Sequence, residues 1–178
     1  MRGALTIAAI LGAAAAGAAA AAERPAASAS LINTEGEPIG TAELHQGPEG
    51  TLVRLELDGL AGGEGFHAIH IHQRGDCSDP GEGFQASGGH LNPQGRQHGL
   101  LNSQGPDAGD FANIYADARG RVRAELFTPW ASLDGAVGAR IRDSDGAALV
   151  IHEGPDDHES QPIGGAGARI ACGVIEGR

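Results

Sequence analysis

The sequence predicts an all-β fold, a sandwich or barrel of antiparallel strands. Short runs of alternating apolar and polar residues recur between turn signals; within residues 51–57, for example, Val53, Leu55 and Leu57 share one face. The 178 residues include 30 glycines and 9 prolines, which favours many turns over long helices. Aromatic residues make up only 3% of the chain, so the core must be built from Val, Ile, Leu and Ala.

Two long irregular segments interrupt the series of predicted strands. We expect strands at residues 30–33, 39–45, 51–57, 65–72, 111–117, 122–127, 139–142, 147–152 and 169–175. Residues 73–109 and 153–168 are polar, rich in glycine and without a period. A long irregular segment inside a compact domain usually has a function, so these two segments are predicted to be functional loops.

The N-terminus has the composition of a secretory signal peptide. A positively charged start at Arg2 precedes an alanine-rich apolar run, and three alanines before Glu23 offer a cleavage site. The alternatives are a transmembrane anchor or an alanine-rich helix, but the run is marginal in length and only weakly apolar. We expect a signal peptide at 1–22, a flexible lead-in at 23–29 and one β domain at 30–178, in a protein exported to the periplasm or secreted.

The charge of the chain excludes some classes of partner. The formal net charge is −11, and all 12 basic residues are arginine. An acidic chain without a basic cluster is a poor partner for nucleic acid or for an anionic membrane. No later apolar run is long enough to cross a bilayer. We therefore expect no nucleic acid partner and, once the signal peptide is removed, no membrane.

Cys77 and Cys172 are the only cysteines of the chain. In an oxidising compartment they most simply form one disulfide, and the alternative is two free buried thiols. Closing a loop of this length would stabilise the fold by about 4–5 kcal/mol in the chain-entropy model, which usually overstates the gain.

Histidines in residues 65–72 suggest a metal site. Residues i and i+2 of a strand point to the same face, so His70 and His72 project side by side and can hold one ion. An isolated pair of this kind is as often a pair of ordinary hydrogen-bonded histidines. Further potential ligands follow, however, and imidazoles with added carboxylates suit copper and zinc. The full set of potential ligands is His70, His72, His90, His98, Asp107, Asp110 and His152.

The order and context of these residues resemble the copper/zinc superoxide dismutase family, in its bacterial exported branch. The matching segments are residues 65–72 (GFHAIHIH), 75–77 (GDC), 88–93 (GGHLNP), 97–99 (QHG), 108–110 (AGD), 150–153 (VIHE) and 167–175 (GARIACGVI). The resemblance implies a Greek-key sandwich or barrel of about eight antiparallel strands with two long functional loops. It also implies one copper and one zinc ion per subunit, and a homodimer is compatible with it.

The resemblance assigns roles to individual residues. Copper ligands are His70, His72, His90 and His152, and zinc ligands are His90, His98 and Asp110. His90 bridges the two metals and carries a proton when it leaves copper, and Arg169 beside copper attracts and orients superoxide. Asp156 hydrogen-bonds one ligand of each metal, Cys77 and Cys172 form the disulfide within the subunit, and His67 is a structural histidine that pins loops.

One position departs from the family pattern. A third zinc histidine is expected three residues before Asp110, and the chain has Asp107 there. Asp107 can bind zinc through oxygen, which would give a site with two carboxylates. The competing hypothesis is that Asp107 does not bind, and that His158 completes the site.

The activity that the resemblance implies is the dismutation of superoxide to dioxygen and hydrogen peroxide, with superoxide as a small anionic substrate. The alternative is a dismutase-like protein that buffers or delivers copper and zinc with little turnover, and a purely structural or adhesive sandwich is a third possibility. Besides Arg169, candidate residues for attracting the anion are Arg74, Arg96 and Arg140.

Overall fold

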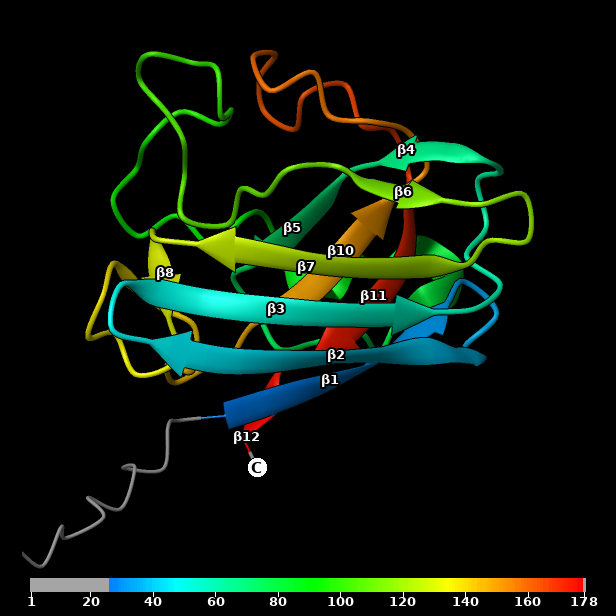
Figure 1. Cartoon of the computed structure of the whole chain (residues 1–178), viewed down its shortest axis with the longest axis horizontal. Helices are drawn as coiled ribbons and strands as arrows, with labels where there is room; N and C mark the ends of the chain where they lie inside the picture. The colour runs from blue at the N-terminus through cyan, green and yellow to red at the C-terminus, as the bar shows by residue number, and fades with distance from the viewer. Residues whose placement is uncertain (1–25, 178) are drawn as a thin grey trace, which may run out of the picture.

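A computed structural model describes residues 26–177 of the chain, and its main feature is one curled antiparallel sheet (Figure 1). The sheet has eight strands in the order β5-β10-β11-β1-β2-β3-β7, with β12 paired to β1. These strands are β1 (Ala26–Asn33), β2 (Pro38–Gly47), β3 (Gly50–Leu57), β5 (Ile69–His72), β7 (Val122–Thr128), β10 (Ala148–His152), β11 (Arg169–Val174) and β12 (Glu176–Gly177). The all-β prediction is confirmed, and the pairings of β3 with β7 and of β5 with β10 require connections of the Greek-key type.

The remaining secondary structure of residues 26–177 consists of short elements. Two small pairs are β4 (Gly65–His67) with β6 (Ile114–Ala116), which is antiparallel, and β8 (Ala131–Ser132) with β9 (Ala139–Arg140), which is parallel. The 3-10 helices are η1 (Pro80–Glu82) and η2 (Gln85–Ser87). In the part of the chain from 26 to 177, no helix is long and apolar enough to cross a membrane.

The core lies between the two halves of the curled sheet. In Figure 1, β2, β3 and β7 cross in front of β5, β10 and β11, and one buried cluster joins residues of both halves. In β3 the inward residues are Val53, Leu55 and Leu57, as the alternation predicts. Their partners are mainly Leu, Ile and Ala, so the predicted aliphatic core is confirmed.

We expected a flexible lead-in at residues 23–29, and this prediction is wrong for residues 26–29, the part that the structure describes. Ala26 to Ala29 belong to β1 and pair with β2, with Ala27 opposite Leu44 and Ala29 opposite Ala42. Ala27 and Ala29 are buried because small side chains on alternate positions fit the crowded interior of the sheet. Composition alone suggested a loop, whereas tertiary pairing decided the outcome. The predicted signal peptide, residues 1–22, lies outside the described residues.

The segment at residues 65–72 is two strands and not one. It is interrupted at Ala68, so that β4 pairs with β6 while β5 pairs with β10. The backbone of Ala68 bonds instead to two neighbours, donating from N to the carbonyl of Gly154 and accepting from the N of His152. The break turns the chain from the small sheet into the main sheet, where His70 and His72 lie beside β10.

The two irregular segments meet at one end of the sheet, the upper end in Figure 1. The backbone N of His98 donates to Gln161 Oε1 at 3.0 Å, and the N of Leu101 donates to the carbonyl of His158 at 3.1 Å. Residues far apart in sequence are therefore joined above the ends of β5 and β10.

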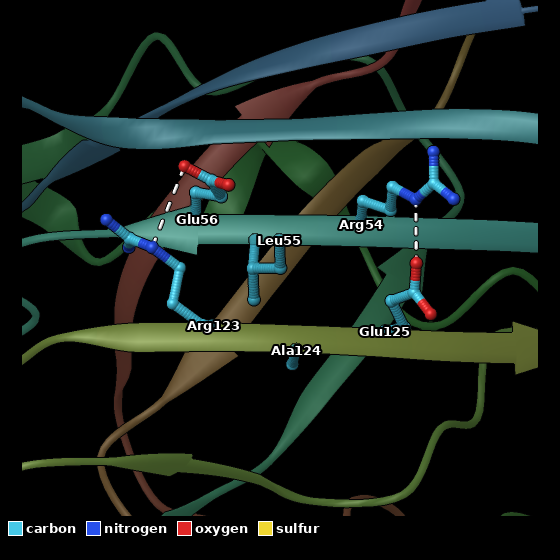
Figure 2. A pocket seen from close by; sticks show the side chains of 6 residues that line it. All are labelled: Arg54, Leu55, Glu56, Arg123, Ala124 and Glu125. Atoms are coloured by element: carbon cyan, nitrogen blue, oxygen red, sulfur yellow. Dashed lines mark hydrogen bonds and ion pairs between the residues drawn. The ribbon is translucent and has the colours of Figure 1, made fainter.

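A surface hollow of about 300 Å³ lies on the outer side of β3 and β7 (Figure 2). It is bounded by two cross-strand ion pairs, Arg54 with Glu125 at 2.7 Å and Glu56 with Arg123 at 3.7 Å. Between them lie Leu55, which is buried in the core, and Ala124 on the neighbouring strand. The charges balance and both ion pairs are exposed. The pairs therefore add only a small cross-strand stabilisation to the sheet.

Candidate metal centre

Three histidines of the main sheet converge on one point. The sheet places His70 beside Val150 and His72 beside Ala148, and His152 ends the same neighbouring strand. One ring nitrogen of each of these histidines lies within 4.8 Å of the others, and all three residues are buried. The register of β5 and β10 therefore builds this cluster, which we call the sheet cluster (His70, His72, His152).

The second nitrogen of each ring is held by a hydrogen bond. His70 Nε2 lies 3.0 Å from Asp156 Oδ2, His72 Nδ1 lies 2.9 Å from the carbonyl of Gly88, and His152 Nδ1 lies 3.1 Å from the carbonyl of Gly167. These partners fix the orientation and the tautomer of each ring. Within the described residues, the remaining nitrogens, His70 Nδ1, His72 Nε2 and His152 Nε2, are buried without a hydrogen-bond partner.

Burial keeps these rings neutral. Loss of hydration lowers the pKa of His70 to about 3 and the pKa of His152 to about 4, and it holds the pKa of His72 well below the usual value. A neutral imidazole with a bare nitrogen is the form that binds a metal. Three such nitrogens facing one point fit a copper ion.

A second group gathers on the first loop and is joined to the sheet cluster by His90. His98 Nδ1 lies 2.6 Å from Asp110 Oδ1, and His90 Nδ1 lies 3.5 Å from the same oxygen. We call His90, His98, Asp107 and Asp110 the loop cluster. The ring centroid of His90 lies 4.0 Å from that of His70, and His90 Nε2 is another buried nitrogen without a partner among residues 26–177. His90 thus contacts the loop cluster through Nδ1, while its ring lies beside that of His70 in the sheet cluster.

Asp107 faces the loop cluster. Its Oδ2 lies 3.0 Å from His90 Nδ1, while its Oδ1 accepts a hydrogen bond from the N of Gly109 at 2.9 Å. The residue is buried, and its own N donates to Asp110 Oδ2 at 3.0 Å. One donor atom each of His90, His98 and Asp110 lies within 4.8 Å of the others, in a group that includes His70 and not Asp107. Imidazoles with carboxylates suit zinc. His158 instead points to Asn113 Nδ2 at 3.3 Å and to Asp156 Oδ2 at 3.5 Å.

Asp156 connects the two clusters. Its Oδ2 contacts His70 Nε2 and its Oδ1 contacts His98 Nε2, both at 3.0 Å. Burial alone would raise the pKa of this carboxyl, but the hydrogen bonds from His70 and His98 outweigh burial and keep the pKa far below its usual value. For His98 burial lowers the pKa, and the bonds to Asp110 and Asp156 outweigh it and raise the pKa to about 10. Asp156 therefore stays ionised between the clusters.

An open pocket of about 280 Å³ borders the clusters. Its walls include His90, Asp107, Arg96 and Arg169. The Arg169 guanidinium donates from Nη1 to the carbonyl of Phe84 at 2.7 Å and from Nη2 to the carbonyl of Gly88 at 2.8 Å. A positive charge is thus fixed beside His90, where a small anion can enter.

Comparisons with known proteins agree with this geometry. The profile of the copper/zinc superoxide dismutases matches residues 39–175. The chain belongs to the copper/zinc superoxide dismutase family. It is 50% identical over 149 residues to a Cu-Zn superoxide dismutase of Aquifex aeolicus (84% of this chain, 85% of the relative). It is 46% identical over 175 residues to one of Caulobacter vibrioides (97% and 98%).

Solved structures of this family share the fold. A double mutant of a superoxide dismutase-like protein from Bacillus subtilis superposes with a TM-score of 0.78 at 36% identity, covering 84% of this chain and 97% of that one. The Cu/Zn superoxide dismutase of Brucella abortus gives a TM-score of 0.67 at 24% identity, covering 85% and 99%, and is evidence for the fold alone.

The predicted disulfide of this dismutase-family chain is confirmed. Cys77 in the first loop is bonded to Cys172 in β11. Cys172 packs with Phe84, Ala148 and Val150 in a small second core beneath the loop. The bond therefore ties residues 73–113 to the strand that carries Arg169.

His67 has the structural role that was predicted. Its Nδ1 lies 3.0 Å from the carbonyl of His152, and its Nε2 lies 3.1 Å from the carbonyl of Gly63. The ring thus joins the end of β10 to the turn before β4, and both its nitrogens are occupied.

Sequence reasoning missed several residues that support the clusters of this dismutase-family site. Asn113 accepts from the N of Asp156 at 2.8 Å and donates to the carbonyl of Asp156 at 2.9 Å, which fixes that residue. Gly88 bonds through its carbonyl to both His72 and Arg169, and its φ of 76° with ψ of −151° requires glycine. Ser87 is also fully buried in this region. No spacing or composition rule distinguishes these residues from ordinary loop residues.

Proposed function

We propose that this chain catalyses the dismutation of superoxide: two superoxide anions and two protons give dioxygen and hydrogen peroxide. The observation that carries the proposal is a set of four buried ring nitrogens, on His70, His72, His90 and His152, that have no hydrogen-bond partner among residues 26–177. One ring nitrogen each of His70, His72 and His152 lies within 4.8 Å of the others, and His90 belongs with His70 to the neighbouring group that includes His98 and Asp110, an arrangement that suits a copper site beside a zinc site. We assign copper to these four histidines, and zinc to His90, His98, Asp110 and Asp107.

The roles of the residues follow from their positions. Copper held by the four histidines would supply the one-electron redox chemistry of dismutation, and zinc held by the loop cluster would fix His90 in place. His90 is the proton carrier in our proposal, because its Nε2 has no hydrogen-bond partner among residues 26–177 and its ring borders the open pocket. Asp156 holds one ring of each cluster and so keeps the spacing between the two metals.

Arg169 is the residue that we expect to bind and orient the anion. A guanidinium has five N–H donors, and its described contacts with Phe84, Ser87 and Gly88 use three of them. Arg96 borders the same pocket, whereas Arg74 and Arg140 are not among its walls. We therefore assign a secondary part in attracting superoxide to Arg96 and not to the other two.

One measurement distinguishes catalysis of dismutation from the rival function, which is the buffering or delivery of metal. Mature protein loaded with copper and zinc should dismute superoxide rapidly and in proportion to its bound copper, as measured by pulse radiolysis. Full copper occupancy with a turnover no faster than that of the metal-free protein would instead establish metal buffering or delivery. The catalytic reading is favoured because the pocket with Arg169 gives a small anion access to His90.

Replacing Asp107 with alanine should lower the zinc content of the purified protein to well under one ion per chain. The change removes an oxygen that lies 3.0 Å from His90 Nδ1, and leaves His90, His98 and Asp110 as the remaining ligands. Metal analysis after dialysis against a competing chelator measures the effect. Asp157→Ala is a matched control, since Asp157 is exposed and accepts hydrogen bonds from Glu159 and Ser160, which belong to neither cluster. Zinc content unchanged in Asp107→Ala would refute ligation by Asp107.

Export completes the proposal. The two cysteines are joined, which fits an oxidising compartment such as the periplasm. We propose that residues 1–22 direct export and are removed. Superoxide that forms outside the cytoplasm would then be the substrate.

A further inference from the structure

Ser87 places a buried hydroxyl between two groups of the proposed site. The residue ends η2, and its side chain is fully buried. Its Oγ lies 3.1 Å from His72 Nδ1, 3.2 Å from Arg169 Nη1 and 2.8 Å from the carbonyl of Phe84. One small side chain therefore contacts a ring of the sheet cluster and the guanidinium at the pocket.

Only one arrangement of protons satisfies all three contacts. A hydroxyl has one proton to donate and two lone pairs that accept. The carbonyl of Phe84 can only accept, so Ser87 must donate to it. Arg169 can only donate, so Oγ accepts from Nη1. The remaining lone pair accepts from His72 Nδ1, whose single proton is shared between Ser87 Oγ and the carbonyl of Gly88, so that Nε2 is left bare.

We propose that Ser87 is a positioning residue that couples the ring of His72 to the guanidinium of Arg169. The inference rests on the proposed function, in which His72 binds copper and Arg169 orients the anion. Together with the carbonyl of Gly88, the hydroxyl holds the ring of His72 in the tautomer whose Nε2 is bare. The same hydroxyl fixes the rotation of the guanidinium about its long, flexible side chain.

The backbone around Ser87 is built to hold this hydroxyl in place. Phe84, which precedes η2, adopts φ 55° and ψ 37°, a left-handed conformation that is costly for a residue with a side chain. Its ring is fully buried beside Cys172, and its carbonyl accepts from both Ser87 Oγ and Arg169 Nη1. Gly88 provides a second link, because its carbonyl contacts His72 and Arg169 as well. Ser87 and Gly88 thus form two parallel bridges between the same two side chains.

Ser87→Ala removes the hydroxyl bridge and leaves the Gly88 bridge. In copper- and zinc-loaded protein we expect azide, used as a small anionic probe of cupric copper, to bind about three- to tenfold more weakly, as for one lost hydrogen bond. The electron paramagnetic resonance spectrum of the bound copper should also change, because the His72 ring is freer to rotate. In the Arg169→Gln background the effect of Ser87→Ala on azide binding should shrink, since the two residues act together.

A matched control is Ser132→Ala, at another fully buried serine, whose Oγ accepts from the N of Val137 at 2.9 Å in β8. It should lower Tm as Ser87→Ala does while leaving the copper spectrum and azide affinity unchanged. Ser87→Thr keeps the hydroxyl and should retain the wild-type spectrum. An unchanged spectrum and unchanged azide affinity in Ser87→Ala would overturn the inference. A wild-type protein that binds copper without turnover would refute the proposed function alone, because the spectrum still reports on Ser87.

Discussion

Arg169→Glu is expected to lower superoxide turnover by about 100- to 1000-fold while copper stays bound. The guanidinium borders the pocket beside His90, and a carboxylate there would repel the anionic substrate where a cation now attracts it. Arg169 itself contributes no ligand to either cluster, so the metal content should not fall. Pulse radiolysis on metal-loaded protein measures the rate, and metal analysis of the same sample measures the copper.

The same substitution at two further arginines tests whether the loss of turnover depends on the position of the charge. Arg96→Glu should lower the rate less than Arg169→Glu, because Arg96 borders the pocket but Arg169 is the guanidinium fixed beside the sheet cluster. Arg140→Glu in β9 makes the same charge change on an exposed side chain outside the pocket walls, and should alter the rate by less than twofold at physiological salt, where exposed charges away from the site are screened. Equal losses in all three variants would mean that net charge, and not the local field, controls the rate. An Arg169→Glu protein with undiminished turnover would refute the assigned role.

The fold and half of the proposed copper site follow from local sequence patterns. Val53, Leu55 and Leu57 alternate with polar residues, and the structure buries them as expected. His70 and His72 share a face for the same reason, since a strand repeats every two residues. Local pattern could not reveal that residues 26–29 pair in β1, because alanine and serine are equally typical of a loop.

The remaining site residues depend on contacts that only the folded chain makes. His90, Asp107 and Asp110 come from one irregular loop, and spacing in a loop does not fix distance as spacing in a strand does. Asp156 looks like a solvated acid in the sequence, yet it is buried between His70 and His98. Its prediction depended on family resemblance.

Serine at both Cys77 and Cys172 is expected to cost about 4–5 kcal/mol of stability and to reduce turnover. The bond closes a loop across a sequence separation of 95, and opening it increases the entropy of the unfolded chain. Function should suffer as well, because the loop that Cys77 holds supplies the carbonyls of Phe84 and Gly88 to Arg169. Denaturant unfolding measures the first effect, and the dismutation rate per bound copper measures the second.

A comparison with Ser132→Ala separates the loss of stability from the loss of turnover in the double variant Cys77→Ser, Cys172→Ser. Both changes destabilise the fold, but Ser132 lies in β8 and makes its hydrogen bond to Val137. At a temperature where both variants stay folded, only the disulfide variant should show weakened anion binding at copper. Equal rates per copper in the two variants would mean that the disulfide contributes stability alone. A loss confined to the disulfide variant would mean that it also holds the loop that orients Arg169.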